Sequence, residues 1–337
     1  MEQDNNKPFK ILSIDGGGIK GLYSSTILER FEEKYDCCIS DHFDMLCGTS
    51  TGGLIALALS LKVPAKKISE FYMGKGKFIF SQNRFSSFKQ LFWGGKYTDK
   101  NLKLSLEEIF KDKRIGDSNN LLCIPAFNYT DSTTCVFKYD HIDGDYGRDN
   151  KIKYVDIALA TSAAPTYFPL CKIEELNKQY IDGGVWANNP TLVGLIEALS
   201  HFVGANRNFH SIKVMSVSSL EIKDGNPIRK NKYLSVARWN KDLLNPFSIG
   251  QNKFVHNSMS FLQKHSDIDL DYYRIPSMDI SRKQENQVGL DSVSDLAIQF
   301  IRGQGKTQAD LFYREEKVKE FFTTPKTIIL NNNNYGK

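Results

Sequence analysis

The sequence lacks the features that would place it across a membrane or around a metal ion. No apolar run approaches the ~18 residues that a transmembrane helix needs, so we expect any membrane contact to be peripheral. Residues 1–7 are polar and do not resemble a signal peptide, which favours a cytoplasmic location. The six cysteines show no C-x-x-C spacing, so reduced thiols are expected, and neither a metal nor another cofactor is predicted.

A strong excess of charge of one sign is also missing. The net charge of +5 over 337 residues is too small for a protein that coats nucleic acid, so no nucleic acid polymer is expected as a partner. An anionic ligand or an anionic membrane surface is compatible with this charge. Hydrophobic residues make up 41% and charged residues 25%, which predicts a packed core in one large domain or two modest ones.

The hydrophobic pattern alternates between strands and helices. Expected strands lie at residues 9–14, 43–47, 121–127, 134–139, 179–181, 212–217 and 272–275, and expected helices at about 22–35, 53–59, 65–72, 98–110, 154–162, 190–203, 249–266, 291–301 and 308–322. This order predicts an α/β fold with three layers, a mostly parallel central sheet with helices on both faces. We expect a core at residues 8–204 and an α/β extension at 205–337 packed on it as one unit, with a disordered tail from about 331.

The stretch Gly48-Thr49-Ser50-Thr51-Gly52 matches the pattern G-x-S-x-G between an apolar strand and a run of helix formers. A serine on such a turn exposes its hydroxyl above the sheet, and the start of the following helix favours developing negative charge. The same five residues also fit a turn without chemistry. The motif therefore makes Ser50 a candidate nucleophile, and other parts of the sequence must supply the remaining groups of an active site.

A second glycine turn, Asp15-Gly16-Gly17-Gly18-Ile19-Lys20-Gly21, follows the first expected strand. Its glycines also satisfy G-x-G-x-x-G, the pattern of a dinucleotide site. Asp15 opposes a pyrophosphate at this place, and no Gly-Lys-Ser/Thr follows as a P-loop requires. The free backbone N–H groups of Gly16, Gly17 and Gly18 therefore favour a cradle for an oxyanion.

The proton acceptor for Ser50 is the third part of the pattern. Four histidines follow Asp182, so a Ser-Asp-His triad is open, but none of the six histidines lies in a glycine-rich or turn context; they are at 42, 141, 201, 210, 256 and 265. Asp182-Gly183-Gly184 is a third glycine-flanked turn after an apolar strand. Desolvation raises the basicity of a buried carboxylate, so Asp182 acting alone with Ser50 is the alternative.

Together these three blocks, with Asn188-Asn189-Pro190, resemble the patatin-like phospholipases. The resemblance implies a Ser–Asp dyad with Ser50 as nucleophile and Asp182 as base, and an oxyanion hole at Gly16–Gly18. The other residues of these motifs, as supporting positions, are Lys20, Gly48, Gly52, Gly183 and Gly184. It also implies a serine acyl hydrolase of phospholipase A1 or A2 type that cleaves acyl esters of membrane glycerophospholipids without a metal. Lys20 departs from the arginine usual in the family, which keeps the charge but loses the bidentate fork.

A narrower resemblance is to bacterial patatin-like effectors of antiphage signalling, carried by residues 9–56 and Tyr97-Thr98. It implies activation by a cyclic dinucleotide and action at the inner membrane face. The sequence leaves the oligomeric state open, with a homodimer or higher oligomer as one possibility. Cations and flat rings suited to such a ligand occur at Arg229, Lys230, Arg238 and Trp239, which also fit a solvated basic loop. Two alternatives stay open: a constitutive lysophospholipase or neutral-lipid hydrolase of the same fold, and a catalytically silent lipid- or nucleotide-binding module.

Residues 71–98 contain nine aromatic and five basic residues and no acidic one. Rings interleaved with cations are typical of a segment that enters a membrane interface, so a lid or membrane role is one interpretation. Aromatic residues that pack on the core or on a second subunit are the other.

Overall fold

A mostly parallel sheet forms the centre of the protein in the computed structural model, which describes residues 7–81, 95–141, 147–222, 228, 233 and 244–330. The strands are β1 (Phe9–Ile14), β2 (Met45–Gly48), β3 (Leu121–Asn128), β4 (Thr133–Lys138), β5 (Cys171–Ile173), β6 (Lys178–Asp182), β7 (Ser211–Val217) and β8 (Asp269–Ile275). Their order is β5-β6-β3-β2-β1-β7-β8, with β4 also paired to β3. β3, β2, β1, β7 and β8 run parallel, whereas β4, β5 and β6 join by antiparallel pairs.

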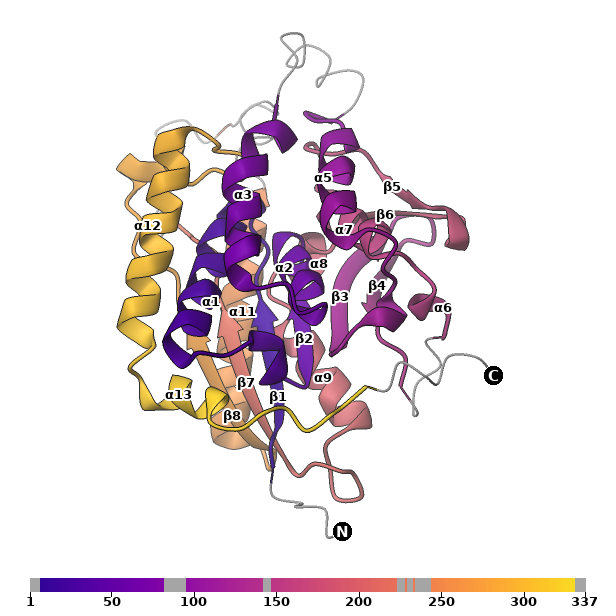
Figure 1. The fold of residues 1–337 in the computed structure, drawn as a ribbon, viewed down its shortest axis with the longest axis vertical. Coiled ribbons are helices and arrows are strands. Elements are labelled where there is room, and N and C mark those ends of the chain that lie inside the picture. The colour runs from indigo at the N-terminus through magenta and orange to yellow at the C-terminus, as the bar shows by residue number, and fades with distance from the viewer. Residues whose placement is uncertain are drawn as a thin grey trace.

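Helices cover both faces of this sheet. They are α1 (Gly21–Tyr35), α2 (Thr51–Ser60), α3 (Ala65–Ile79), α5 (Lys100–Phe110), α6 (Gly147–Asn150), α7 (Tyr154–Ser162), α8 (Gly184–Ala187), α9 (Thr191–His201), α11 (Leu244–His265), α12 (Asp295–Phe312) and α13 (Glu316–Phe322). In Figure 1, α1, α2, α3, α5, α7 and α12 lie in front of the sheet, and α9 and α11 lie behind it. The predicted three-layer α/β architecture is confirmed.

Burial on both faces explains the apolar character of the central strands. All six residues of β1 are buried, including Lys10. On one face Gly194 of α9 packs against Ile11 and Cys47, and a side chain there would meet the Cys47 sulfur. A strand that is covered on both faces has no solvent-facing side for polar residues, so its sequence is a continuous hydrophobic run.

The predicted elements are found, with differences at their ends. The helix predicted at 65–72 continues to Ile79, and the one predicted at 291–301 begins at Asp295, where the Ser294 side chain accepts a hydrogen bond from the amide of Ala297 (3.2 Å), and it continues to Phe312. The single last helix predicted at 308–322 is wrong. The chain breaks after Phe312 and a separate helix, α13, buries Phe321 against the core.

Tertiary contacts explain that break. The Tyr35 hydroxyl donates a hydrogen bond of 2.5 Å to the Tyr313 carbonyl, which directly follows α12. A side chain from another part of the protein therefore satisfies a carbonyl at the point where the helix ends. The following turn lets Phe321 stack on Phe43, with ring centroids 5.8 Å apart. Local propensity favours one continuous helix, but burying Phe321 offsets the cost of the turn.

The extension predicted at residues 205–337 contributes β7 and β8 to the same sheet, next to β1. The tail predicted to be disordered from about 331 lies outside the described residues. Of the helices that the structure describes, none is both long enough and apolar enough to cross a bilayer.

Candidate active site

The topology brings the three glycine turns to one edge of the sheet. β1 and β2 are parallel neighbours, so the turns that follow them lie side by side. β3 is longer than β2, and β6 pairs with its far end, where Ala126 lies opposite Asp182. This register carries Asp182 to the level of the turn after β2. The Ser50 Oγ donates to Asp182 Oδ2 at 2.7 Å.

Ser50 has the strained backbone of a nucleophile turn. Its φ of 54° and ψ of −124° are unfavourable for a residue with a side chain, and α2 begins at the next residue. The Ser50 N–H donates to Thr161 Oγ1 at 3.0 Å, and the Thr161 hydroxyl donates to the Pro125 carbonyl at 2.6 Å. Thr161 therefore ties the turn to β3 and holds the strained conformation in place.

The glycines on either side of Ser50 are required by close backbone contacts. A Cβ on Gly48 would lie 2.1 Å from the Gly52 carbonyl oxygen, and one on Gly52 would lie 2.2 Å from the Ile14 carbonyl oxygen. A Cβ on Gly183 would likewise lie 2.3 Å from the Pro125 carbonyl oxygen. These contacts fix which residue types each turn accepts.

Asp182 has the properties of a base. Burial raises the pKa of Asp182 from its ordinary 3.8 to about 6, although hydrogen bonds from the Gly184 N–H (2.6 Å) and the Ser50 hydroxyl oppose the shift. A carboxylate with this pKa is ionised at neutral pH and is a stronger base than a solvated aspartate. No histidine is among the described residues that line the cavity around the pair.

The glycine cradle divides into a structural part and a free part. The Gly16 N–H donates to the Asn188 carbonyl at 2.9 Å, so it is already paired. The N–H groups of Gly17 and Gly18 have no hydrogen-bond acceptor among the described residues. Gly18 has a φ of +60°, and a Cβ there would lie 2.3 Å from the Leu290 carbonyl oxygen. Gly17 and Gly18 are thus the amides available to an oxyanion.

Charged side chains on either side fix the cradle. The Lys20 Nζ donates to the Leu220 carbonyl at 2.8 Å, so Lys20 braces the loop in this structure. Asp15 is fully buried and pairs with Arg274 of β8, with Nη2 to Oδ2 at 2.5 Å. Burial raises the pKa of Asp15 to about 6, and the Arg274 guanidinium opposes that shift. The pair anchors the first residue of the glycine turn to β8, which is separated from β1 by β7 alone.

Ser50 and Asp182 open into a cavity of about 910 Å³. Apolar side chains from residues distant in sequence form about half of its wall: Ile19, Leu54, Phe71, Tyr72, Ile79, Phe80, Leu102, Pro165, Phe168, Val185, Pro246, Phe247, Ile249, Val288 and Leu290. Ser162 and Ser219 also line it, and their buried hydroxyls have no hydrogen-bond partner among the described residues. The cavity can hold an acyl chain beside a reacting ester.

The aromatic-basic segment contributes to this cavity in part. Phe71, Tyr72 and Phe80 line it, and Phe80 packs edge-on against Tyr97 at 5.3 Å between centroids. For these three residues the structure therefore agrees with the interpretation that the aromatic side chains of the segment pack on the core. Residues 82–94 lie outside the described residues, so the lid or membrane interpretation concerns a part that the structure does not describe.

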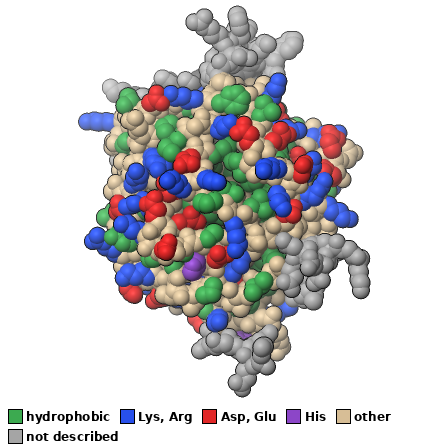
Figure 2. All heavy atoms as spheres, in the orientation of Figure 1, with side chains coloured by type: hydrophobic (Ala, Val, Ile, Leu, Met, Phe, Trp, Pro, Cys, Tyr) green, Lys and Arg blue, Asp and Glu red, His purple; other side chains and the backbone are tan. Residues whose placement is uncertain are grey.

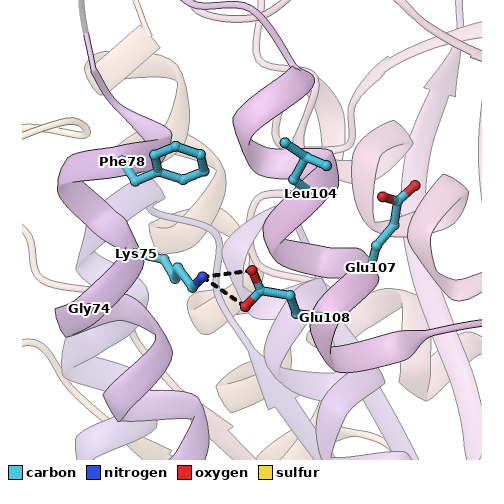
Figure 3. Close-up of a pocket in the computed structure, with 6 residues that line it drawn as sticks. All are labelled: Gly74, Lys75, Phe78, Leu104, Glu107 and Glu108. Carbon is cyan, nitrogen blue, oxygen red and sulfur yellow. Dashed lines mark hydrogen bonds and ion pairs between the residues drawn. The ribbon is translucent and has the colours of Figure 1, made fainter.

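A second hollow lies on the outer surface between α3 and α5 (Figure 3). Its ionic groups pair with each other, since Lys75 Nζ contacts both carboxylate oxygens of Glu108 at 2.7 and 2.8 Å. Glu107 points away from that ion pair, and Phe78 and Leu104 line the rim (Figure 3). With no nucleophile beside a base, this hollow does not compete with the Ser50 site.

Among the described residues, His141, Glu197 and His201 form the one cluster with ligand atoms close enough for a metal ion, within 4.8 Å of one another. The Glu197 carboxylate already accepts from Lys138 Nζ at 2.5 Å and contacts His141 Nε2 at 3.3 Å. An ammonium in contact with the central ligand opposes a cation, and the cluster does not line the cavity. These residues form an ion-pair network.

The sequence profile of the patatin-like phospholipases matches residues 12–195, more than half of the chain, and spans the three glycine turns. The chain belongs to the patatin-like phospholipase family. Membership implies lipid ester hydrolase activity, in agreement with a serine–carboxylate pair at a cavity with a partly apolar wall.

Relatives of this patatin-like phospholipase include bacterial and plant proteins. It is 28% identical to a cGAMP-activated phospholipase of Escherichia coli (strain TW11681), over 94% of this chain and 93% of the relative. It is 29% identical to a cGAMP-activated phospholipase of Pseudomonas aeruginosa, over 89% and 88%. It is also 31% identical to patatin-like protein 2 of Arabidopsis thaliana, over 79% and 74%.

Sequence reasoning missed three residues of the site, Thr161, Asn188 as a carbonyl acceptor, and Arg274. Each acts through a contact with a segment far away in the chain, so no local pattern marks it. The cations and ring considered for a nucleotide, Arg229, Lys230, Arg238 and Trp239, lie outside the described residues.

Proposed function

We propose that this patatin-like phospholipase hydrolyses acyl esters of membrane glycerophospholipids through a Ser50–Asp182 dyad. The observation that carries the proposal is the 2.7 Å hydrogen bond from the Ser50 hydroxyl to a buried carboxylate, at one wall of a partly apolar cavity of about 910 Å³. A fatty acyl chain fits the cavity walls, and its ester carbonyl then lies between Ser50 and the free glycine amides.

In the first step, Ser50 Oγ attacks the ester carbonyl carbon while its proton passes to Asp182 Oδ2. The carbonyl oxygen becomes an oxyanion, which the N–H groups of Gly17 and Gly18 stabilise. The C–O bond to the glycerol then breaks, and the leaving alkoxide takes the proton from Asp182. The products are a lysophospholipid and an acyl-Ser50 ester.

In the second step, water replaces the alcohol. Asp182 takes a proton from the water as its oxygen attacks the acyl carbon, and the same amides hold the second oxyanion. The bond to Ser50 Oγ breaks, the proton returns to Ser50, and the fatty acid leaves. A carboxylate with a pKa of about 6 can take and return this proton at neutral pH.

Purified protein with phosphatidylcholine and phosphatidylglycerol vesicles tests the proposal, with released fatty acid and lysophospholipid as products. Ser50→Ala and Asp182→Asn should each lower the rate by at least ~10⁴-fold, since the two residues act as a unit. Unchanged hydrolysis by Ser50→Ala would refute the mechanism. Labelled acyl chains at sn-1 and sn-2 distinguish phospholipase A1 from A2 action, and lysophospholipid and triacylglycerol substrates test the two same-fold alternatives.

We further propose that a cyclic dinucleotide activates the enzyme and that it serves antiphage defence at the inner membrane face of a bacterial cell. Support comes from the relatives named as cGAMP-activated phospholipases, which align with 89–94% of this chain. Adding cGAMP should raise vesicle hydrolysis at least ~10-fold. A protein that is fully active without nucleotide, and gains nothing from a panel of cyclic dinucleotides, would refute the regulatory part and leave the dyad untouched.

A further inference from the structure

Helix α11 has an apolar side turned to solvent. Phe247, Phe254 and Phe261 are 58%, 67% and 62% exposed, and they follow one another at intervals of seven residues. Seven residues are close to two helical turns, so the three rings lie along one side of the helix. We call them the phenylalanine stripe. Three large apolar rings exposed along one side of a helix are rare unless that side binds another protein or a membrane.

The stripe is separate from the side of α11 that packs on the protein. Asn252, Val255 and Met259 are buried at the spacing of a second helical face. That inner face already supplies the contact with the core, including the packing of α11 on β8. The exposed rings are therefore an additional apolar surface and not the ordinary inner side of a surface helix.

The charge along α11 is of one sign. The helix contains no Asp or Glu, and Lys253 and Lys264 are both exposed, with His265 at its end. By contrast, the face over α1, α3 and α12 shows Lys and Arg interspersed with Asp and Glu (Figure 2). Large rings accompanied by cations alone are the composition of a helix that lies in the interface of an anionic bilayer.

The stripe also begins at the catalytic cavity. Phe247 and Pro246 line the cavity that contains Ser50 and Asp182. One turn further on, Gln251 Nε2 donates to the Gly184 carbonyl at 3.1 Å, directly after the catalytic aspartate turn. Val185, 36% exposed, lies beside this contact and adds to the apolar surface. A membrane bound along the stripe would thus present lipid at the cavity mouth.

We propose that the phenylalanine stripe docks the protein on an anionic phospholipid bilayer, with α11 parallel to the membrane plane. The inference rests on the proposed action on membrane phospholipid. A second copy of the chain fits less well. In a two-fold dimer the same surface meets itself, so the cations of α11 would face the cations of the other copy with no acidic residue on either helix to pair them.

Vesicle flotation of a Phe254→Ser/Phe261→Ser variant tests the docking face. Phe247 is kept because it lines the cavity. The vesicles contain phosphatidylcholine with about one third phosphatidylglycerol, and every protein carries Ser50→Ala so that lipid is not consumed. We expect vesicle affinity to fall at least ~10-fold, since losing ~1.4 kcal/mol of ring burial is tenfold.

The matched control is Leu296→Ser/Leu311→Ser on α12, which removes two leucines that are 73% and 58% exposed. It should bind vesicles as the parent does. A Lys253→Gln/Lys264→Gln variant should lose the preference for anionic over pure phosphatidylcholine vesicles. With Ser50 restored and cGAMP present, the double phenylalanine variant should keep its rate on a soluble short-chain ester while its rate on vesicles falls, which also shows that it is folded.

Three outcomes separate the claims. Undiminished flotation of the phenylalanine variant overturns the docking inference. A dimeric parent that becomes monomeric in this variant, by analytical ultracentrifugation, assigns the stripe to a second copy and also overturns it. Flotation that depends on the stripe in a protein that cleaves no vesicle lipid supports the docking face and refutes the proposed phospholipid substrate instead.

Discussion

Replacing Asp182 by asparagine should abolish catalysis and at the same time make the folded protein more stable at alkaline pH. Burial raises the pKa of this carboxyl group from 3.8 to about 6. A group whose pKa is higher in the folded than in the unfolded state destabilises the folded form increasingly as the pH rises above the unfolded value, and this penalty is complete above the folded value. Below the unfolded value the group is protonated in both states, and the penalty disappears.

The size of the effect follows from the shift. A difference of about two pKa units corresponds to about 3 kcal/mol at a pH well above 6. The asparagine side chain has a single acceptor oxygen, and this oxygen can still accept the hydrogen bond from the Gly184 N–H. The hydrogen bond that Asp182 Oδ2 accepts from Ser50 is then lost, which costs about 1 kcal/mol of stability. We therefore expect Asp182→Asn to be about 2 kcal/mol more stable than wild type at pH 8. Near pH 4 the difference should vanish or reverse.

Urea unfolding at pH 4.5, 6 and 8, followed by circular dichroism, measures this difference. Asp15 has a raised pKa as well, but it is present in both proteins and cancels. Ser50→Ala is the control, because it removes the proposed nucleophile and leaves the buried charge in place, so it should gain no stability at pH 8. A variant less stable than wild type at pH 8, with a difference that does not vary with pH, would refute the argument that the carboxylate is held ionised at a cost.

The remaining predictions concern the rate and the scaffold. The value of kcat/KM should rise about tenfold per pH unit below 6 and level off above it, because Asp182 must be deprotonated to act as base, as a pH–rate profile will show. Thr161→Val should lower kcat about 10–100-fold with little change in KM, because the amide of the nucleophile loses its acceptor. Gly18→Ala should lower kcat at least ~100-fold, because its Cβ would lie 2.3 Å from a carbonyl oxygen beside the oxyanion site. Arg274→Met should lower the free energy of unfolding by about 3–5 kcal/mol by leaving Asp15 buried and unpaired, and Asp15→Asn in addition should restore part of it in urea unfolding.

Much of the candidate site was predictable because short stretches of neighbouring residues mark it in the sequence. A serine on a G-x-S-x-G turn and an aspartate on a glycine turn are recognisable by their neighbours, since Gly48, Gly52 and Gly183 are each required by a backbone contact within their own turn or with an adjacent strand. The central strands β1 and β2 were predictable for a similar reason, because two covered faces leave every residue of each buried. The last helix was not, because its break depends on Tyr35 and Phe43, which lie far earlier in the chain than the residues they contact.

The sequence by itself determined the α/β class, the three turns and the pairing of Ser50 with Asp182 as candidates. Only the tertiary structure decided how they act together. The register of β6 on β3 sets the 2.7 Å contact, and the carbonyl of Asn188 occupies the Gly16 amide and leaves Gly17 and Gly18. Arg274 reaches Asp15 across 259 residues of chain. Such contacts depend on which strands become neighbours, and no local pattern of side chains encodes that choice.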